Sequence, residues 1–156
     1  MGTRSRIGVM HGDNCKSVYC HWDGYLDFNG KLLLEHYDSS KANHLVALGD
    51  LSGLRPEVFI PEGVEHSFEK PAENVTIFYG RDRGETDTGW ETDATFEAFF
   101  ERAKDCGAEY YYIMKDGEWF DGNTYSSDKE LCGKLVPLAE ALADQDIENH
   151  ELVSAE

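Results

Sequence analysis

The sequence predicts an α+β fold, with a single antiparallel sheet of about five strands and about four helices packed mainly on one face. Two hairpin patterns support the sheet, because β-rich segments flank the turn residues 11–14 and Asp116-Gly117. The helical part is supported by the apolar spacing of 96–103. The length of 156 residues suits one domain, which we expect over 1–145, with an acidic C-terminal tail over 146–156.

The N-terminal third is expected to hold a hairpin and two short helices. Residues 4–10 and 16–22 are the strands of the hairpin. An apolar stripe over about 28–37 indicates the first helix. The second begins after Ser39 or Ser40, which are suitable N-caps, and ends at Gly49.

The middle of the chain is less regular. Residues 50–74 contain three of the four prolines and indicate a long loop or a small hairpin. A strand is expected over 75–79, followed by a mobile loop over 80–84. The acidic and Thr-rich stretch over 85–91 is expected to be exposed.

The clearest helix follows. Thr92 or Asp93 is expected to cap it and Gly107 to end it, with one apolar face formed by Phe96, Phe99, Phe100 and Ala103. Residues 109–114 and 118–120 form the second hairpin. A capping box at 127–130 opens a last helix to about residue 144, which Pro137 is expected to kink or restart.

The charge is strongly negative and uneven. The net charge is −17; residues 1–78 hold 11 acids and 7 bases, whereas residues 79–156 hold 20 acids and 7 bases. Such a field repels nucleic acid and anionic membranes and attracts a basic partner surface. The candidate partner-binding surface is a run of six acids with no base between them: Glu85, Asp87, Glu91, Asp93, Glu97 and Glu101.

Two clusters are candidates for ligand binding. The first holds His21, Trp22, Asp23 and Tyr25 at the end of the second strand, where a His–Asp pair suits acid–base work and the aromatic rings suit stacking. The same pattern also fits packing of Trp22 and Tyr25 in the core, with His21 in a structural hydrogen bond. The second cluster is Arg81 and Arg83, placed between glycines after a strand. Their guanidinium groups match phosphate, unless they pair with neighbouring acids such as Asp82 and Glu85.

Known enzyme and metal patterns are missing. The sequence contains no phosphate-binding loop, dinucleotide fingerprint, zinc-protease motif or nucleophile elbow. The four cysteines form no C-x-x-C pair, and their spacing with histidine matches no zinc site. We therefore expect no metal, no cofactor and no catalytic residues. Without a long apolar run or a signal-peptide pattern, we expect a cytoplasmic protein with reduced thiols.

Four segments of the chain resemble a family of small uncharacterised proteins found in phage and bacterial genomes. The resemblance covers about residues 3–120 and is carried by TRSRIG at 3–8, YCHWDGY at 19–25, LGDLS at 48–52 and YGRDRGE at 79–85. It implies a phage or prophage setting, and hence the cytoplasm of a bacterial host cell. Small acidic proteins there often act against host defence, but the resemblance implies no activity and no catalytic residues.

Three hypotheses about function follow. The leading one is a non-enzymatic protein that inhibits a host factor, such as a defence complex, by presenting a DNA-like acidic surface. The second is a protein that sequesters a cyclic-nucleotide or ADP-ribose-type signal, with Arg81 and Arg83 on phosphate and Trp22, Tyr19 or Tyr25 on the base. The third is an enzyme that uses His21 and Asp23 on a phosphorylated substrate. Convergence of Arg81, Arg83 and His21 on one pocket would favour the second and third.

Overall fold

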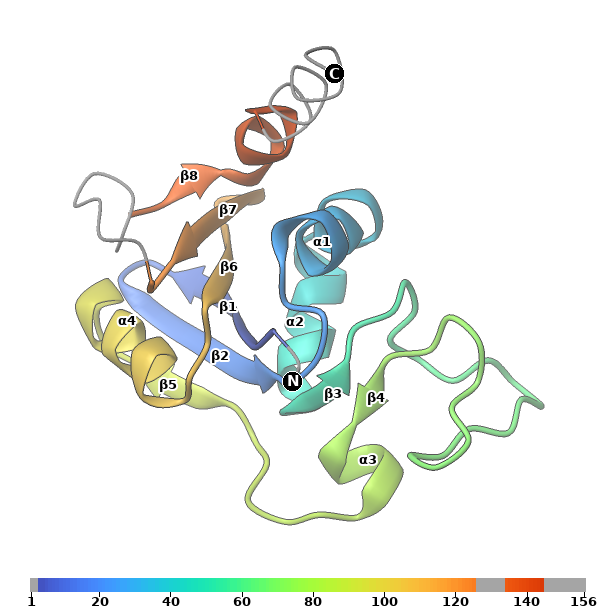
Figure 1. Ribbon diagram of the computed structural model, residues 1–156. Helices are drawn as coiled ribbons and strands as arrows, with labels where there is room; N and C mark the ends of the chain where they lie inside the picture. Colours follow the sequence, from blue (N-terminus) through green and yellow to red (C-terminus); the bar gives the residue numbers. More distant parts are fainter. Residues whose placement is uncertain (1–2, 126–133, 145–156) are drawn as a thin grey trace.

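The computed structural model describes residues 3–125 and 134–144 and shows a mixed sheet with helices on both sides (Figure 1). The eight strands run in the order β4-β3-β2-β1-β6-β7-β8, and β5 pairs with β2 beside that path. Their bounds are β1 Ser5–His11, β2 Asn14–Cys20, β3 Leu51–Gly53, β4 Ile77–Phe78, β5 Glu91–Asp93, β6 Tyr110–Lys115, β7 Glu118–Asn123 and β8 Val136–Pro137.

Five named helices connect these strands. They are the π-helix η1 Leu26–Gly30 and the α-helices α1 Lys31–His36, α2 Ser39–Ala47, α3 Tyr79–Arg83 and α4 Phe96–Asp105. A further helical segment begins at residue 138 and continues to 144, where the described part ends.

The prediction of a single antiparallel sheet of about five strands was wrong. The two hairpins, β1–β2 and β6–β7, are antiparallel as expected, but β1 pairs with β6 in parallel and β2 pairs with β3 in parallel. Two parallel neighbouring strands must be joined by a long crossover connection. Helices η1, α1 and α2 lie in the connection from β2 to β3, and α4 lies in the connection that leads into β6. Turn chemistry specifies a hairpin locally, whereas the pairing of one hairpin with the next depends on distant contacts.

The prediction that the helices cover mainly one face was also wrong. On β6, Tyr112 and Met114 join the larger core beneath α1 and α2, while Tyr111 and Ile113 pack with Phe99 of α4 on the opposite face. Alternation along the strand produces this division, because successive side chains point to opposite faces. The sheet therefore has an α1–α2 face and an α4 face (Figure 1).

Several local predictions are confirmed with shifted ends. The helix expected after Thr92 or Asp93 is present as α4, but its cap is the Thr95 hydroxyl, which accepts a hydrogen bond from the Ala98 N–H at 3.1 Å, while Thr92 and Asp93 belong to β5. Helix α2 is capped by Asp38, one residue before the expected serines, through the Lys41 N–H at 2.8 Å. The Asp116-Gly117 turn has both residues at positive φ, 51° and 79°, as a two-residue hairpin turn requires.

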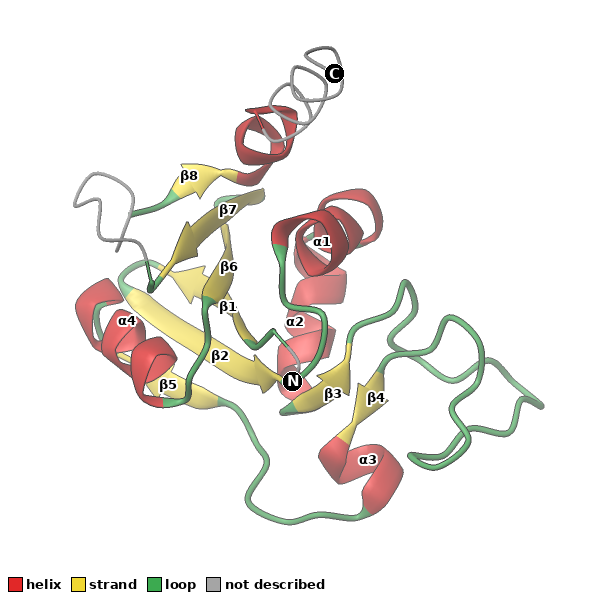
Figure 2. Ribbon diagram, viewed as in Figure 1, coloured by secondary structure: helices red, strands yellow, loops and turns green. Residues whose placement is uncertain are grey.

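Other segments differ from expectation. Residues 79–83 form the short helix α3 instead of a mobile loop, and β5 is a strand that the sequence did not indicate. Residues 54–76 form a long connection between β3 and β4, seen as the large loop in Figure 2, with one isolated bridge between Glu57 and Val75. The capping box at 127–130 and the predicted tail at 146–156 lie outside the described residues.

The described part of the last predicted helix begins later than expected. Residues 136–137 belong to strand β8, and helical structure starts only after Pro137. This agrees with the restart expected at Pro137, since proline fits the start of a helix better than its interior. None of the helices described has both the length and the apolar character needed to cross a membrane.

Gly122 in β7 is a position where a side chain has no room. A Cβ atom there would overlap the ring and hydroxyl of Tyr111, which is fully buried and donates a hydrogen bond to the Lys134 carbonyl at 2.6 Å. We expect Gly122→Ala to lower the free energy of unfolding by about 1–3 kcal/mol through overpacking. Urea denaturation measures this, with Gly89→Ala as the control, because a Cβ at Gly89 meets open space. Equal stability of the two variants would contradict the expectation.

Candidate functional site

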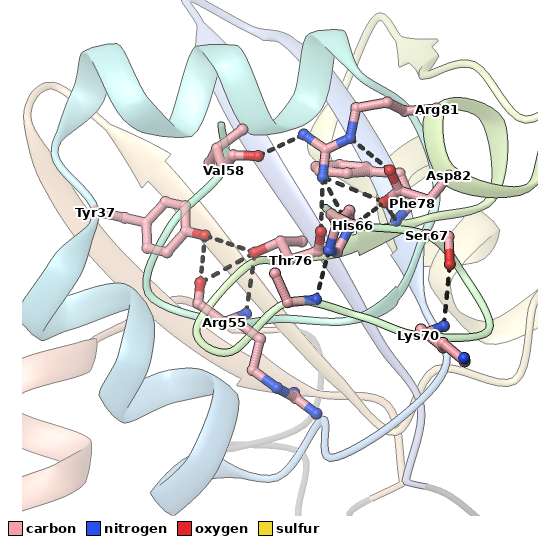
Figure 3. A network of polar contacts seen from close by, with 11 residues as sticks. Tyr37, Arg55, Val58, His66, Ser67, Lys70, Thr76, Phe78, Arg81 and Asp82 are labelled. Atoms are coloured by element: carbon pink, nitrogen blue, oxygen red, sulfur yellow. Dashed lines mark hydrogen bonds and ion pairs between the residues drawn. The ribbon is translucent and has the colours of Figure 1, made fainter. Parts of the chain in front are cut away.

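Arg81 is held inside a network of polar contacts that joins α3 to the long 54–76 connection (Figure 3). Its guanidinium donates to the Val58 carbonyl at 2.5 Å and to the Thr76 carbonyl at 2.8 Å. It also pairs with Asp82, with 2.8 Å between Nε and Oδ1, and lies 4.7 Å from the centre of the Phe78 ring. Arg81 therefore fastens the connection to the sheet and is not available as a free phosphate ligand.

Asp82 is the centre of the same network. Its side chain is only 2% exposed, and besides Arg81 it accepts from the Phe78 N–H at 2.8 Å and contacts His66 Nε2 at 3.0 Å. His66 Nδ1 accepts the Ala72 N–H at 2.9 Å, so Nε2 carries the proton that is donated to Asp82. Burial raises the pKa of Asp82, but the hydrogen bonds from Arg81, Phe78 and His66 outweigh burial and leave the pKa below its usual value.

Arg83 lies apart from this network. Its guanidinium stacks 4.7 Å from the Phe68 ring centre, and its Nε is 3.9 Å from Glu85. It lines a shallow cavity of about 440 Å³ together with Ser67, Phe68, Glu69 and Asp82. His21 is not among those residues, so Arg83 and the aromatic cluster do not share that cavity.

The His21 cluster lies at the end of β2. His21 Nδ1 is 2.7 Å from the Tyr19 hydroxyl, and its ring meets the Trp22 ring edge-on at 4.6 Å between centres. No hydrogen bond joins His21 to Asp23 within the described chain; Asp23 takes a positive φ of 56° in the turn after the strand. Tyr25 contacts Phe28. The expected His–Asp pair is not formed, while Trp22 and Tyr25 stay exposed.

Carboxylates from three separate segments meet on the α4 face. Asp50, Glu91, Glu101 and Asp105 line one groove of about 530 Å³, together with Arg6, Ala98, Arg102 and Cys106. We call this cavity the polar groove. Burial raises the pKa of Asp50, whose Oδ1 accepts the Tyr19 N–H at 2.8 Å.

The six predicted surface acids do not all face solvent. Glu85, Asp87, Glu91, Glu97 and Glu101 are exposed. Asp93 is buried and forms a two-point ion pair with Arg102, at 2.9 and 3.0 Å, which ties β5 to α4. Asp93 thus has a structural role.

Arg6 is a buried residue of the polar groove that the sequence did not single out, as it did not single out Asp50, Arg102 and Asp105. It is 4% exposed, and its Nε donates to the Ser17 hydroxyl at 2.8 Å. A usable signal was present: Arg4 and Arg6 lie two residues apart in the segment 4–10 that was predicted as a strand, and two residues of that spacing share a face. Arg6 also lies directly across from Tyr19 of β2.

Metal binding has no support in the described residues, since no three His, Cys, Asp or Glu side chains there are grouped to hold an ion. Cys15, Cys20 and Cys106 are free thiols. Burial raises the pKa of Cys15 to about 12 and that of Cys20 to about 11, which keeps both protonated and unreactive.

Comparison with known proteins gives no match to any protein-family model, curated protein or solved structure. Any ligand or partner of the polar groove and of the α4 face is therefore proposed from the geometry of these two sites.

Proposed function

We propose that the protein is a non-catalytic binding protein that presents the α4 face to a basic surface of a partner protein. The observation that carries this proposal is the spacing of Glu97, Glu101 and Asp105 along α4. They are four residues apart and all exposed, so they form one line of negative charge on a single helix face. We call this line the acidic ridge.

The acidic ridge is held rigidly. The opposite face of α4 packs Phe99 and Ala103 into the core, and Arg102 pairs with the buried Asp93. A rigid array of charge loses little conformational freedom on binding. Like charges four residues apart weaken a helix by a few tenths of a kcal/mol per pair, so the helix carries a small cost that a partner's cations would relieve.

The alternative hypotheses find less support in the contacts. Arg81 is engaged by protein acceptors, Arg83 lines a cavity that His21 does not line, and His21 bonds Tyr19 instead of Asp23. Ion-paired and scattered arginines are what the acidic-surface hypothesis expects. The family resemblance adds a setting in which the partner is a nucleic-acid-binding protein of bacterial defence, inhibited when the ridge occupies its basic surface.

The test compares two triple variants of equal net charge. In E97Q/E101Q/D105N the acidic ridge is neutralised; in E62Q/E65Q/E69Q three exposed acids of the 54–76 connection are neutralised instead. We expect the wild type and the control to capture proteins with basic, nucleic-acid-binding surfaces from bacterial lysate at low salt. The ridge variant should capture about tenfold less, and raising the salt should release the captured proteins.

Two outcomes would overturn the proposal. One is capture that is lost equally in both variants, which would indicate a general effect of net charge. The other is the absence of any basic partner in the wild-type sample, identified by mass spectrometry, at low as well as high salt.

A further inference from the structure

Arg6 is a buried cation without a close anion. No carboxylate of the described residues lies within 4.0 Å of its guanidinium, although the chain holds 31 acids and 14 Lys and Arg residues. The Asp50 carboxylate attracts the Arg6 guanidinium electrostatically, but from a distance greater than 4.0 Å. Buried charges are normally paired, because an unpaired one is costly to desolvate.

The hydrogen bonds of Arg6 leave donors free for a ligand. Two of its five N–H groups donate to oxygen, at 2.8 Å to the Ser17 hydroxyl and at 3.3 Å to the Ser17 carbonyl. Among the described residues, Nη1 meets only the Cys106 sulfur at 4.0 Å, a weak acceptor. The guanidinium lines the polar groove, so its remaining donors are accessible from that cavity.

Arg4 supplies a second guanidinium nearby. Two residues before Arg6, it lies on the same face of the chain, and its Nη1 lies against Gly107, which directly follows Cys106 of the polar groove. Arg4 is exposed, and within the described chain its side chain makes no ion pair and no hydrogen bond. Two unpaired arginines two residues apart match the oxygens of a phosphate group.

Groups that suit the remainder of such a ligand line the polar groove together with Arg6 or lie next to it. Asp50 and Glu91 offer carboxylate acceptors to hydroxyl or amino donors. Tyr19, across the sheet from Arg6, hydrogen-bonds His21 next to the exposed Trp22 ring. The cavity of about 530 Å³ has the volume of a small-ligand site.

From these contacts we propose that the polar groove binds a small phosphorylated molecule, with its phosphate on Arg4 and Arg6 and its hydroxyl or amino groups on Asp50 and Glu91. Sugar phosphates and mononucleotides share this chemistry. The site goes beyond the proposed partner-binding function: Glu101 and Asp105 belong both to the acidic ridge and to the polar groove, whereas Arg4 and Arg6 belong only to the proposed phosphate site.

The experiment measures binding to the full chain by calorimetry and by thermal shift. The probes are inorganic phosphate, ribose 5-phosphate and adenosine 5′-monophosphate, with ribose and adenosine as phosphate-free controls. We expect at least one of the two organic phosphates to bind and to raise the melting temperature, and the phosphate-free compounds to do neither. Tighter binding of adenosine 5′-monophosphate than of ribose 5-phosphate would support a nucleotide, and equal binding a sugar phosphate.

Two single variants, at Arg4 and at Arg6, test the role of the two arginines, and a third variant, at Arg83, is the control. Arg4→Ala removes an exposed side chain and should weaken binding about tenfold or more while the fold is kept. Arg83→Ala removes an exposed arginine elsewhere and should leave binding unchanged. Arg6→Lys keeps the charge but loses the fork of donors, and should also weaken binding.

Three results would overturn the site. The first is no binding of any phosphorylated probe up to ~10 mM, far above an expected dissociation constant. The second is binding that Arg4→Ala and Arg83→Ala reduce equally. The third is binding of inorganic phosphate without either organic phosphate, which would remove the role assigned to Asp50 and Glu91. Because Arg4→Ala leaves the acidic ridge intact, failure of the phosphate site can be distinguished from failure of the proposed partner binding.

Discussion

Replacing Asp82 with alanine is expected to lower the free energy of unfolding by about 3–5 kcal/mol, the usual cost of removing one partner from a buried ion pair. The Asp82 carboxylate accepts from Arg81, His66 and the Phe78 N–H, and its side chain is 2% exposed. Its loss leaves the Arg81 Nε–H, the His66 Nε2–H and the Phe78 N–H without this acceptor, at a side chain that is almost completely buried. Urea denaturation followed by circular dichroism measures the change.

Arg83→Ala is the matched control, one residue further along α3. Its side chain is 55% exposed and its nearest carboxylate is 3.9 Å away, so its removal should change stability by no more than about 0.5 kcal/mol. If Asp82→Ala cost less than about 1 kcal/mol, or no more than Arg83→Ala, the network would not hold the 54–76 connection as the contacts indicate.

This network also shows why the sequence left open whether Arg81 binds a phosphate or pairs with protein groups. The local pattern of two arginines between glycines is typical of an exposed anion-binding loop. The acceptors that occupy Arg81 belong to Val58 and Thr76, which are 23 and 5 residues away, and to the adjacent Asp82. Only Asp82 was visible as a neighbour. A guanidinium engaged by main-chain carbonyls of a distant loop leaves no signal in the residues that flank it.

The sequence likewise predicted the fold only where interactions between residues close in sequence determine it. The Asp116-Gly117 turn and the apolar face of α4 follow from interactions within about ten residues, and both were found correctly. The parallel pairing of β1 with β6 joins residues about 105 positions apart, such as Ser5 with Tyr110. Strand β5 has one buried residue in three, so no alternation identifies it as a strand. Its position depends on β2 and on the Asp93–Arg102 pair.

The polar groove contains some residues that the sequence singled out and others that it did not. Its two arginines, Arg6 and Arg102, come from β1 and α4, its acids come from the residue before β3, from β5 and from α4, and these segments meet only in the folded sheet. Of the residues that line it, the sequence singled out Glu91 and Glu101 by their charge. It missed Arg6 because an arginine within a β-rich run resembles an exposed residue of a hairpin. The burial of Arg6 is a property of α4 packing over that end of the sheet.

Asp121 is the site of the second large effect, and that effect depends on pH. It lies in β7 opposite Tyr112 of β6, and its Oδ1 is buried with no hydrogen-bond partner among the described residues. Burial raises the pKa of Asp121 from 3.8 to about 7, against a smaller opposing effect of the Gly122 N–H. The folded state therefore binds the proton more tightly than the unfolded state does.

The sign of the pH dependence follows from this difference. Between about pH 4 and pH 7 the folded chain keeps a proton that the unfolded chain has lost, so stability falls as the pH rises through this range. The full contribution of the group corresponds to roughly 4 kcal/mol, since one pKa unit is worth about 1.4 kcal/mol. Asp82 acts in the opposite sense, because its lowered pKa makes its contribution decline only in acid, as the pH falls through its folded-state pKa.

Asp121→Asn should remove this dependence, because the amide stays neutral while keeping the shape of the carboxyl group. We expect the variant to be more stable than the wild type by about 2 kcal/mol or more near pH 8, and the difference to shrink near pH 5.5. Urea denaturation at the two pH values measures both. Glu118→Gln, an exposed acid of the same strand, should follow the wild type. A wild type and an Asn variant with parallel pH profiles would show instead that the Asp121 carboxylate is solvated in the folded protein.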